Sequence, residues 1–234
     1  MKIIHLIGAI ALSITSVGCA PTKPSNPYTD VRDKKNYKTV KIGKQVWMAE
    51  NLNYEASGSM CYGEGGKELL GYDGNTPIYN TLSKAEIQTN CQKYGRLYNW
   101  KTAKTACPKG WRLPRDKDWN VLMKFVNPNC SDNINCDNDE TKCSCDDAGA
   151  KLKATSGWNS NGNGTDEFGF SALPGGFSHS DGSSANVGNC SSWWSATEDK
   201  ADKAYNLDMG HEYDTVYMFY NNKDLFFSVR CVQD

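Results

Sequence analysis

Four of the ten cysteines lie in one short stretch together with six carboxylate side chains. The cysteines are Cys130, Cys136, Cys143 and Cys145, and the acidic residues are Asp132, Asp137, Asp139, Glu140, Asp146 and Asp147. Asp137-Asn-Asp139 lacks the following glycine and the terminal glutamate of an EF-hand calcium loop, and Cys143 and Cys145 are too close for a usual zinc knuckle. We interpret residues 127–148 as a solvated acidic insertion without a metal site, and calcium binding remains the alternative.

The other candidate nucleophiles and bases form no recognisable catalytic set. His179 and His211 stand beside no nucleophile motif, and Cys190 and Cys231 are two ordinary late cysteines by their local sequence. The glycine pair at Gly175 is followed by neither Lys-Ser/Thr nor a helix pattern, so it does not indicate phosphate binding. A formal charge of −1 gives no electrostatic reason to expect nucleic acid. We therefore expect a non-catalytic protein without a cofactor, and enzymatic activity is the alternative.

The N-terminus has the pattern of an export signal. Met1-Lys2 precedes an apolar run, residues 3–14, which is too short to span a bilayer and ends in small residues before Cys19. Residues 16–19 resemble the lipobox of bacterial lipoproteins, which implies a signal peptide of residues 1–19 and a lipid-modified Cys19. The alternatives are ordinary cleavage near Ala20, with Cys19 removed, and a buried structural Cys19.

A lipid on Cys19 would anchor the chain in the bacterial cell envelope and leave the domain outside the bilayer. Ala20 is not the aspartate that signals inner-membrane retention, so the outer membrane is favoured, and either side of that membrane is open. Residues 20–36 hold three of the eight prolines and little apolar periodicity. They are predicted to form a flexible tether before a domain of residues 37–234.

Two disulfides are predicted from the positions of the cysteines. Cys61 and Cys91 bracket a loop with little core of its own, so joining its ends would stabilise it. Cys231 lies in the last strand, which needs fixing to the domain, and Cys107 at the end of a helix is its natural partner. The pairing of Cys130, Cys136, Cys143, Cys145 and Cys190 remains open.

Apolar periodicity predicts an α+β fold with two helices, short strands and long irregular loops. One helix runs from Leu97 and stops before Pro108, and a second opens at Pro114 and includes Val126. A hairpin turns at Gly43-Lys44. Four strands are predicted near the C-terminus, and the last two would form a hairpin about Asn221–Asp224. These strands cover Ser192–Ala196, Ala204–Met209, Thr215–Tyr220 and Leu225–Val232.

Six segments together resemble the Fibrobacter succinogenes major paralogous domain, a family of exported bacterial proteins. They are Val46–Asn53, Tyr94–Trp100, Cys107–Pro114, Phe168–Gly176, Trp193–Glu198 and Ser228–Val232. The resemblance covers nearly all of residues 37–234, although Arg115 replaces a helix-capping threonine frequent in the family and the acidic insertion is unusual. It implies a C-type-lectin-like fold, with a twisted and mainly antiparallel sheet, related to that of formylglycine-generating enzymes.

Three functions are compatible with this sequence. The first is a lectin-like binding module for polysaccharide or another envelope protein, and the second is an assembly component of the envelope. The third is an oxidase similar to formylglycine-generating enzymes, which would need two neighbouring reactive thiols. For the first function Trp158, beside an Asn- and Gly-rich loop, is the candidate exposed aromatic residue. Trp47, Trp100, Trp111 and Trp119 are predicted core residues, and Trp193 and Trp194 should face opposite sides of a strand.

Overall fold

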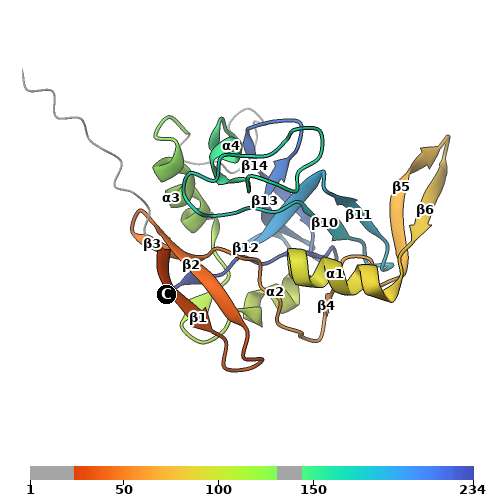
Figure 1. Ribbon diagram of the computed structural model, residues 1–234, viewed down its shortest axis with the longest axis horizontal. Helices are drawn as coiled ribbons and strands as arrows, with labels where there is room; N and C mark the ends of the chain where they lie inside the picture. Colours follow the sequence, from red (N-terminus) through yellow and green to blue (C-terminus); the bar gives the residue numbers. More distant parts are fainter. Residues whose placement is uncertain (1–23, 131–143) are drawn as a thin grey trace, which may run out of the picture.

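The computed structural model describes residues 24–130 and 144–234, which form a mixed domain of helices and mainly antiparallel strands (Figure 1). The helices are α1 (Lys84–Tyr94), α2 (Trp100–Ala106), α3 (Asp116–Val126) and α4 (Ala148–Leu152). Of these, α2 and α3 are the predicted pair, but Leu97, expected in the first helix, lies in a strand before it. No helix in the described ranges is long and apolar enough to cross a membrane.

Helix α1 occupies a segment that the sequence analysis assigned to a loop. It begins with a capping box, in which the Glu86 carboxylate accepts a hydrogen bond from the Ser83 backbone N–H at 2.7 Å and the Ser83 hydroxyl accepts one from the Glu86 N–H at 3.3 Å. The spacing Ser-x-x-Glu is a sequence signal for a helix start. The apolar residues of α1 show little helical periodicity, because only Cys91 and Tyr94 are buried. The apolar pattern therefore did not predict this helix.

The smaller sheet contains both the first and the last described strands. Its order is β1 (Pro24–Thr29), β2 (Asn36–Ile42), β3 (Gln45–Met48), β16 (Val232–Gln233) and β8 (Trp111–Arg112). The predicted turn at Gly43-Lys44 joins β2 to β3, with Gly43 at φ 61°. The expected tether is therefore too long, because Pro24–Thr29 form β1 and Asn36 begins β2. Prolines are compatible with β1 because it is an edge strand, which pairs with β2 alone.

The larger sheet has eleven described strands. Its main order is β4 (Ser59–Met60), β7 (Leu97–Tyr98), β15 (Phe227–Ser228), β12 (Cys190–Lys200), β10 (Gly175–Ser178), β11 (Ser184–Val187), β5 (Lys67–Asp73) and β6 (Thr76–Thr81). A branch from β12 adds β13 (Lys203–Gly210), β14 (Val216–Asn222) and β9 (Ser144–Cys145). Three of the pairings are parallel: β10–β12, β12–β15 and β5–β11.

The predicted hairpin about Asn221–Asp224 is wrong. Strand β14 pairs with β13 and β9, so its hydrogen bonds are made elsewhere. The segment that follows is divided between the two sheets: β15 lies between β12 and β7, and β16 lies between β3 and β8. The residues predicted as one strand, Leu225–Val232, thus contribute to two short strands in different sheets.

Strand β12 separates two hydrophobic clusters. Trp193 and Trp194 are both fully buried, and they belong to different clusters, as expected for neighbours on a strand. Trp193 shares its cluster with Trp47 and Trp119, whose ring centroids are 4.9 Å apart. Trp194 packs on Phe227 at 4.4 Å. The predicted core positions of Trp47, Trp100, Trp111 and Trp119 are confirmed.

A buried polar hub links three distant parts of the chain. The Asn51 side-chain oxygen accepts hydrogen bonds from Trp193 Nε1 at 2.8 Å and from Arg230 Nη2 at 2.7 Å. Asn51 Nδ2 donates to the Tyr94 carbonyl at 2.9 Å and to the Ser228 hydroxyl at 3.2 Å. The Arg230 guanidinium lies 4.5 Å from the centre of the Phe170 ring, and its burial lowers its pKa to about 9. Arg230 forms no ion pair with a described carboxylate. Its guanidinium donates its hydrogen bonds to amide and carbonyl oxygens instead.

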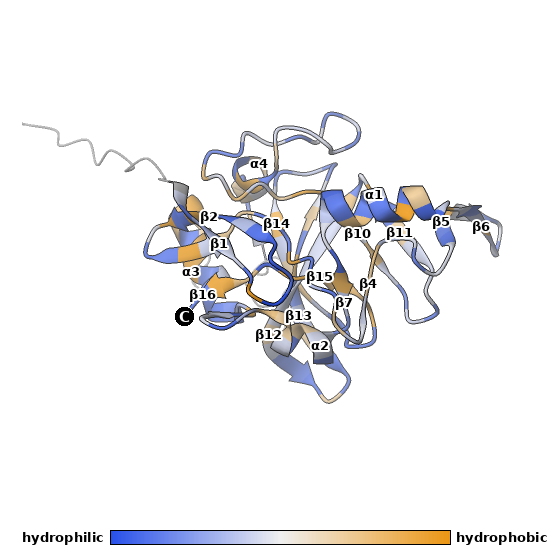
Figure 2. Cartoon of the chain, turned by 60° about the horizontal axis from the view of Figure 1, so that its bottom comes forward, coloured by the Kyte–Doolittle hydropathy of each residue, from blue (hydrophilic) through white to orange (hydrophobic). Residues whose placement is uncertain are grey.

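The β5–β6 hairpin extends from the edge of the larger sheet, away from the rest of the domain in both views (Figures 1 and 2). Every residue of β6 is exposed. The two strands of the hairpin carry four exposed large apolar side chains: Leu70 and Tyr72 on β5, and Ile78 and Tyr79 on β6. We call this hairpin the β5–β6 arm.

Candidate functional site

Trp158 is not the exposed ligand-binding residue that the sequence suggested. Only 4% of its surface is accessible, and its Nε1 donates to the Ala172 carbonyl at 2.9 Å. The ring packs in the same cluster as Trp193, with the Lys153 Nζ 5.4 Å from its centre. The neighbouring Asn- and Gly-rich loop is irregular, as expected, and its Asn163 side chain accepts a hydrogen bond from the Trp158 backbone N–H at 3.0 Å.

The cysteines are arranged as structural bridges. Cys61 pairs with Cys91 and Cys107 with Cys231, the two pairs expected from the sequence, and Cys130 pairs with Cys145. Within the described ranges Cys190 alone is unpaired, and burial raises the pKa of its thiol to about 12. Since Cys231 is bonded to Cys107, the structure does not bring Cys190 and Cys231 together as a pair of reactive thiols. Cys19, Cys136 and Cys143 lie outside the described residues.

Three aromatic side chains form a partly exposed line along β14 and the turn before it, which we call the aromatic row. Tyr217 and Phe219 alternate with the buried Val216 and Met218, so both point away from the core. Their ring planes lie within 11° of each other, with centroids 5.5 Å apart. Tyr213 meets Tyr217 edge to face at 5.3 Å. The row thus offers adjacent ring surfaces that the sequence analysis did not identify as a site.

Gly210 and Asp208 position the Tyr213 ring. A Cβ on Gly210 would lie 2.5 Å from the Tyr213 Cζ, so only glycine allows the ring to rest on this end of β13. The Tyr213 hydroxyl donates to the Asp208 carboxylate at 3.4 Å, and Ser192 Oγ donates to it at 2.7 Å. Burial raises the pKa of the Asp208 carboxyl, and the hydrogen bonds from Ser192 and Tyr213 partly oppose this shift. Burial and the nearby Asp208 raise the pKa of Tyr213 as well.

A polar hollow of about 360 Å³ adjoins the Tyr213 end of the row. It is lined by Ser160, Asn161, Gly162, His211, Glu212, Tyr213 and Asp214. Ser160 and Asn161 have φ values of 51° and 61°, an uncommon conformation for residues other than glycine. Such backbone persists where surrounding contacts enforce it, and here Gly162 lies so close to the next turn that a Cβ would be 2.4 Å from the His211 carbonyl oxygen.

Lys153 fixes the turn that forms one wall of the hollow. Its buried ammonium donates to the carbonyls of Gly210 at 3.2 Å and Tyr213 at 2.9 Å, and it lies 3.5 Å from the Asp214 carboxylate. Burial lowers the pKa of Lys153, while Asp214 opposes this shift. The Lys153 ammonium bonds within the turn and does not line the hollow. The wall of the hollow therefore presents carboxylate, amide and imidazole groups.

Metal binding has no support within residues 24–130 and 144–234, where no three His, Cys, Asp or Glu side chains are grouped as metal ligands would be. Most of the acidic insertion lies outside these ranges. No hydrogen bond joins the imidazole of His179 or His211 to a hydroxyl or thiol of the described residues: His211 Nδ1 is 3.2 Å from the Asn189 carbonyl oxygen, and Nε2 is 3.7 Å from Glu212.

These features define a disulfide-linked α+β domain with aromatic and polar side chains gathered on one strand and two loops. The family model described as Fibrobacter succinogenes major domain matches residues 40–233, and the chain belongs to that family. No curated protein and no solved structure matches the chain. Three of the motifs noted above supply Asn51, Trp193 and Arg230 to the buried hub, so these motifs build the fold. The aromatic row and the polar hollow lie outside all six motifs.

Proposed function

We propose that this chain is a lipid-anchored envelope protein whose domain binds polysaccharide at the aromatic row and polar hollow. The observation that carries this proposal is the near-parallel pair of Tyr217 and Phe219 beside a hollow lined with amide, carboxylate and imidazole groups. Sugar rings have apolar C–H faces that stack on aromatic rings, and hydroxyls that bond to such polar groups. The acidic lining favours neutral chains, because it would repel polysaccharides rich in carboxylates.

We also propose that the fold is C-type-lectin-like and related to that of formylglycine-generating enzymes. Support comes from α2 and α3, the mainly antiparallel sheets and the long loops. The oxidase function is less well supported than binding, because Cys231 is engaged with Cys107.

Polysaccharide binding predicts that Tyr217→Ala and Phe219→Ala each weaken retention on affinity gels of neutral polysaccharides. Loss of one stacking ring should cost about 1 kcal/mol, roughly a fivefold loss of affinity. Native gel electrophoresis with xylan, mannan or β-glucan in the gel measures the retardation. Tyr72→Ala is the matched control, since Tyr72 is 64% exposed on the distant β5–β6 arm. Equal retardation of all three variants and the parent chain on every gel that retards the parent would contradict the site.

The second candidate function is assembly with another envelope protein, and the β5–β6 arm favours it. Leu70 and Tyr72 are each 64% exposed there, more than a large apolar side chain in the core-facing part of a sheet would be. If the arm is the functional surface, Tyr72→Ala reduces cross-linking to envelope proteins in cells and leaves polysaccharide retention unchanged. The same pair of measurements therefore separates the two functions.

The lipid anchor predicts that Cys19→Ser moves the exported protein from the detergent phase to the aqueous phase in a Triton X-114 partition. The acyl chains supply the membrane affinity, so their loss should not affect the folded domain. The thermal midpoint, followed by circular dichroism, should be the same for both forms. Equal partitioning of both forms would rule out lipidation at Cys19.

A further inference from the structure

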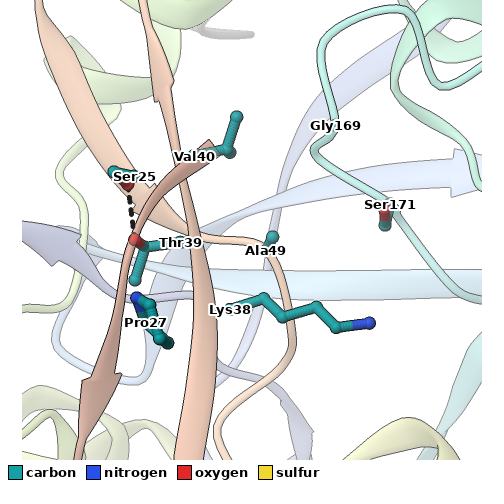
Figure 3. A pocket seen from close by; sticks show the side chains of 8 residues that line it. All are labelled: Ser25, Pro27, Lys38, Thr39, Val40, Ala49, Gly169 and Ser171. Carbon is teal, nitrogen blue, oxygen red and sulfur yellow. Dashed lines mark hydrogen bonds between the residues drawn. The ribbon is translucent and has the colours of Figure 1, made fainter. Parts of the chain in front are cut away.

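Two hollows of about 370 and 410 Å³ adjoin each other along β2. They share Lys38, Ala49 and Ser171, so they form one groove between the β1–β2 hairpin and the loop of residues 166–173. Figure 3 shows the residues that line the first hollow. We call it the β2 groove. It is built from different residues than the aromatic row and the polar hollow.

One end of the β2 groove is apolar. Pro27, Val40, Ala49 and Gly169 line it together with the hydroxyls of Ser25 and Thr39. These two hydroxyls bond to each other (Figure 3), and Thr39 Oγ1 also donates to the Asn26 carbonyl at 2.9 Å. Their hydrogen bonds are therefore made within the protein, and this end suits an alkyl chain.

The other end of the β2 groove is cationic. Lys35, Lys38 and Lys93 line it, whereas Glu50 is the one carboxylate among its lining residues. None of the three lysines forms an ion pair with a described carboxylate. Lys35 is half-buried, and burial lowers its pKa. An anionic group here would gain charge-assisted hydrogen bonds that the protein itself does not supply.

The wall opposite β2 is held in place before any ligand arrives. The Asp166 carboxylate accepts hydrogen bonds from the Ser171 N–H at 2.7 Å and the Ser171 hydroxyl at 2.6 Å, which holds Ser171 at φ 52°. Gly169 has φ 66°, and a Cβ there would touch the Val40 side chain at 3.4 Å. A preformed groove loses little conformational freedom on binding, which favours affinity.

We propose that the β2 groove binds a single-chain anionic amphiphile of the fatty-acid class. The alkyl chain lies against Pro27, Val40 and Ala49, and the carboxylate lies among Lys35, Lys38 and Lys93. A groove with one apolar end and one cationic end matches the two ends of this ligand, whereas a neutral sugar would use neither.

Calorimetric titration of the exported chain carrying Cys19→Ser tests the proposal without competing detergent. The probes are a long-chain fatty acid, the alcohol of the same chain length, and acetate. The fatty acid should bind about tenfold more tightly than the alcohol, because the alcohol has no carboxylate to form a charge-assisted hydrogen bond. Acetate, which lacks the alkyl chain, should not bind measurably. Fatty-acid binding no tighter than alcohol binding would overturn the proposal.

Two exposed lysines on β2 provide a matched pair of variants. Lys38→Glu should weaken fatty-acid binding about tenfold and alcohol binding much less, because Lys38 borders both ends of the groove but only the fatty acid carries a charge. Lys41→Glu makes the same charge change on the same strand outside the groove and should alter neither. Ala49→Phe should block the alkyl chain and abolish both. Equal effects of Lys38→Glu and Lys41→Glu would overturn the proposal even if Ala49→Phe fails to fold.

Discussion

Replacement of both Cys107 and Cys231 by alanine should lower the free energy of unfolding by about 4 to 5 kcal/mol. This bridge closes a loop with a sequence separation of 124, and in the chain-entropy model a longer loop constrains the unfolded chain more strongly. Urea unfolding followed by tryptophan fluorescence, under non-reducing conditions, measures the change.

The Cys61→Ala/Cys91→Ala variant is the matched control for the long bridge. Its loop has a separation of 30, so its removal should cost about 3 to 4 kcal/mol. A cost for the short bridge equal to or above that of the long one would contradict the loop-length argument. Peptide mapping that linked Cys231 to a cysteine other than Cys107 would contradict the pairing itself.

Replacement of Asn51 by leucine should destabilise the domain by about 3 to 5 kcal/mol, because it removes the oxygen that accepts from Arg230 and Trp193 and leaves a buried guanidinium short of partners. Leucine is close to asparagine in size, so the effect reports lost hydrogen bonds more than lost volume. Urea unfolding provides the measurement, with Asn53→Leu as the control two residues along the chain.

Asn51→Asp refines this test. Aspartate keeps an oxygen for Arg230 and Trp193 but loses the amide that donates to Tyr94 and Ser228. Its free energy of unfolding should lie between those of the parent and Asn51→Leu. If Asn51→Leu unfolds at the same urea concentration as Asn53→Leu, the hub does not stabilise the fold.

The parts of the fold that follow local rules were predictable from the sequence. Trp119, Leu122, Met123 and Val126 repeat at helical spacing, and they face the core from α3. Trp193 and Trp194 alternate, and they enter different clusters. In these cases the period of the apolar residues alone decides which face is buried.

The remaining features depend on neighbours that a local pattern does not contain. β1 is a strand because β2 offers an edge to it, and β15 and β16 are separate strands because their partners lie in different sheets. Trp158 is buried because its ring packs in the same cluster as Trp193 and its Nε1 reaches the Ala172 carbonyl. A tryptophan beside glycines and asparagines has the same local sequence whether its ring is buried or exposed.

The candidate site was partly readable from the sequence. The alternation in Val216–Tyr220 predicts a strand with Tyr217 and Phe219 on the face opposite Val216 and Met218, so an outward aromatic pair could have been inferred. Tyr213 could not, because its place depends on the approach of its ring to Gly210. The polar hollow joins residues 160–162 to 211–214, and no local pattern links two loops so far apart.

The position of β16 determines when folding can finish. Val232 pairs with Trp47 on one side and Arg112 on the other, so β3 and β8 have no strand between them until the last strand is available. Contacts of such long sequence separation slow folding, because the chain loses entropy before the contacts form. A nascent chain therefore cannot complete the smaller sheet until residues near 232 have been synthesised. Under the proposed export this order of events would suit translocation, since a translocation channel accepts an unfolded chain and the final strand would complete the domain on the far side of the membrane.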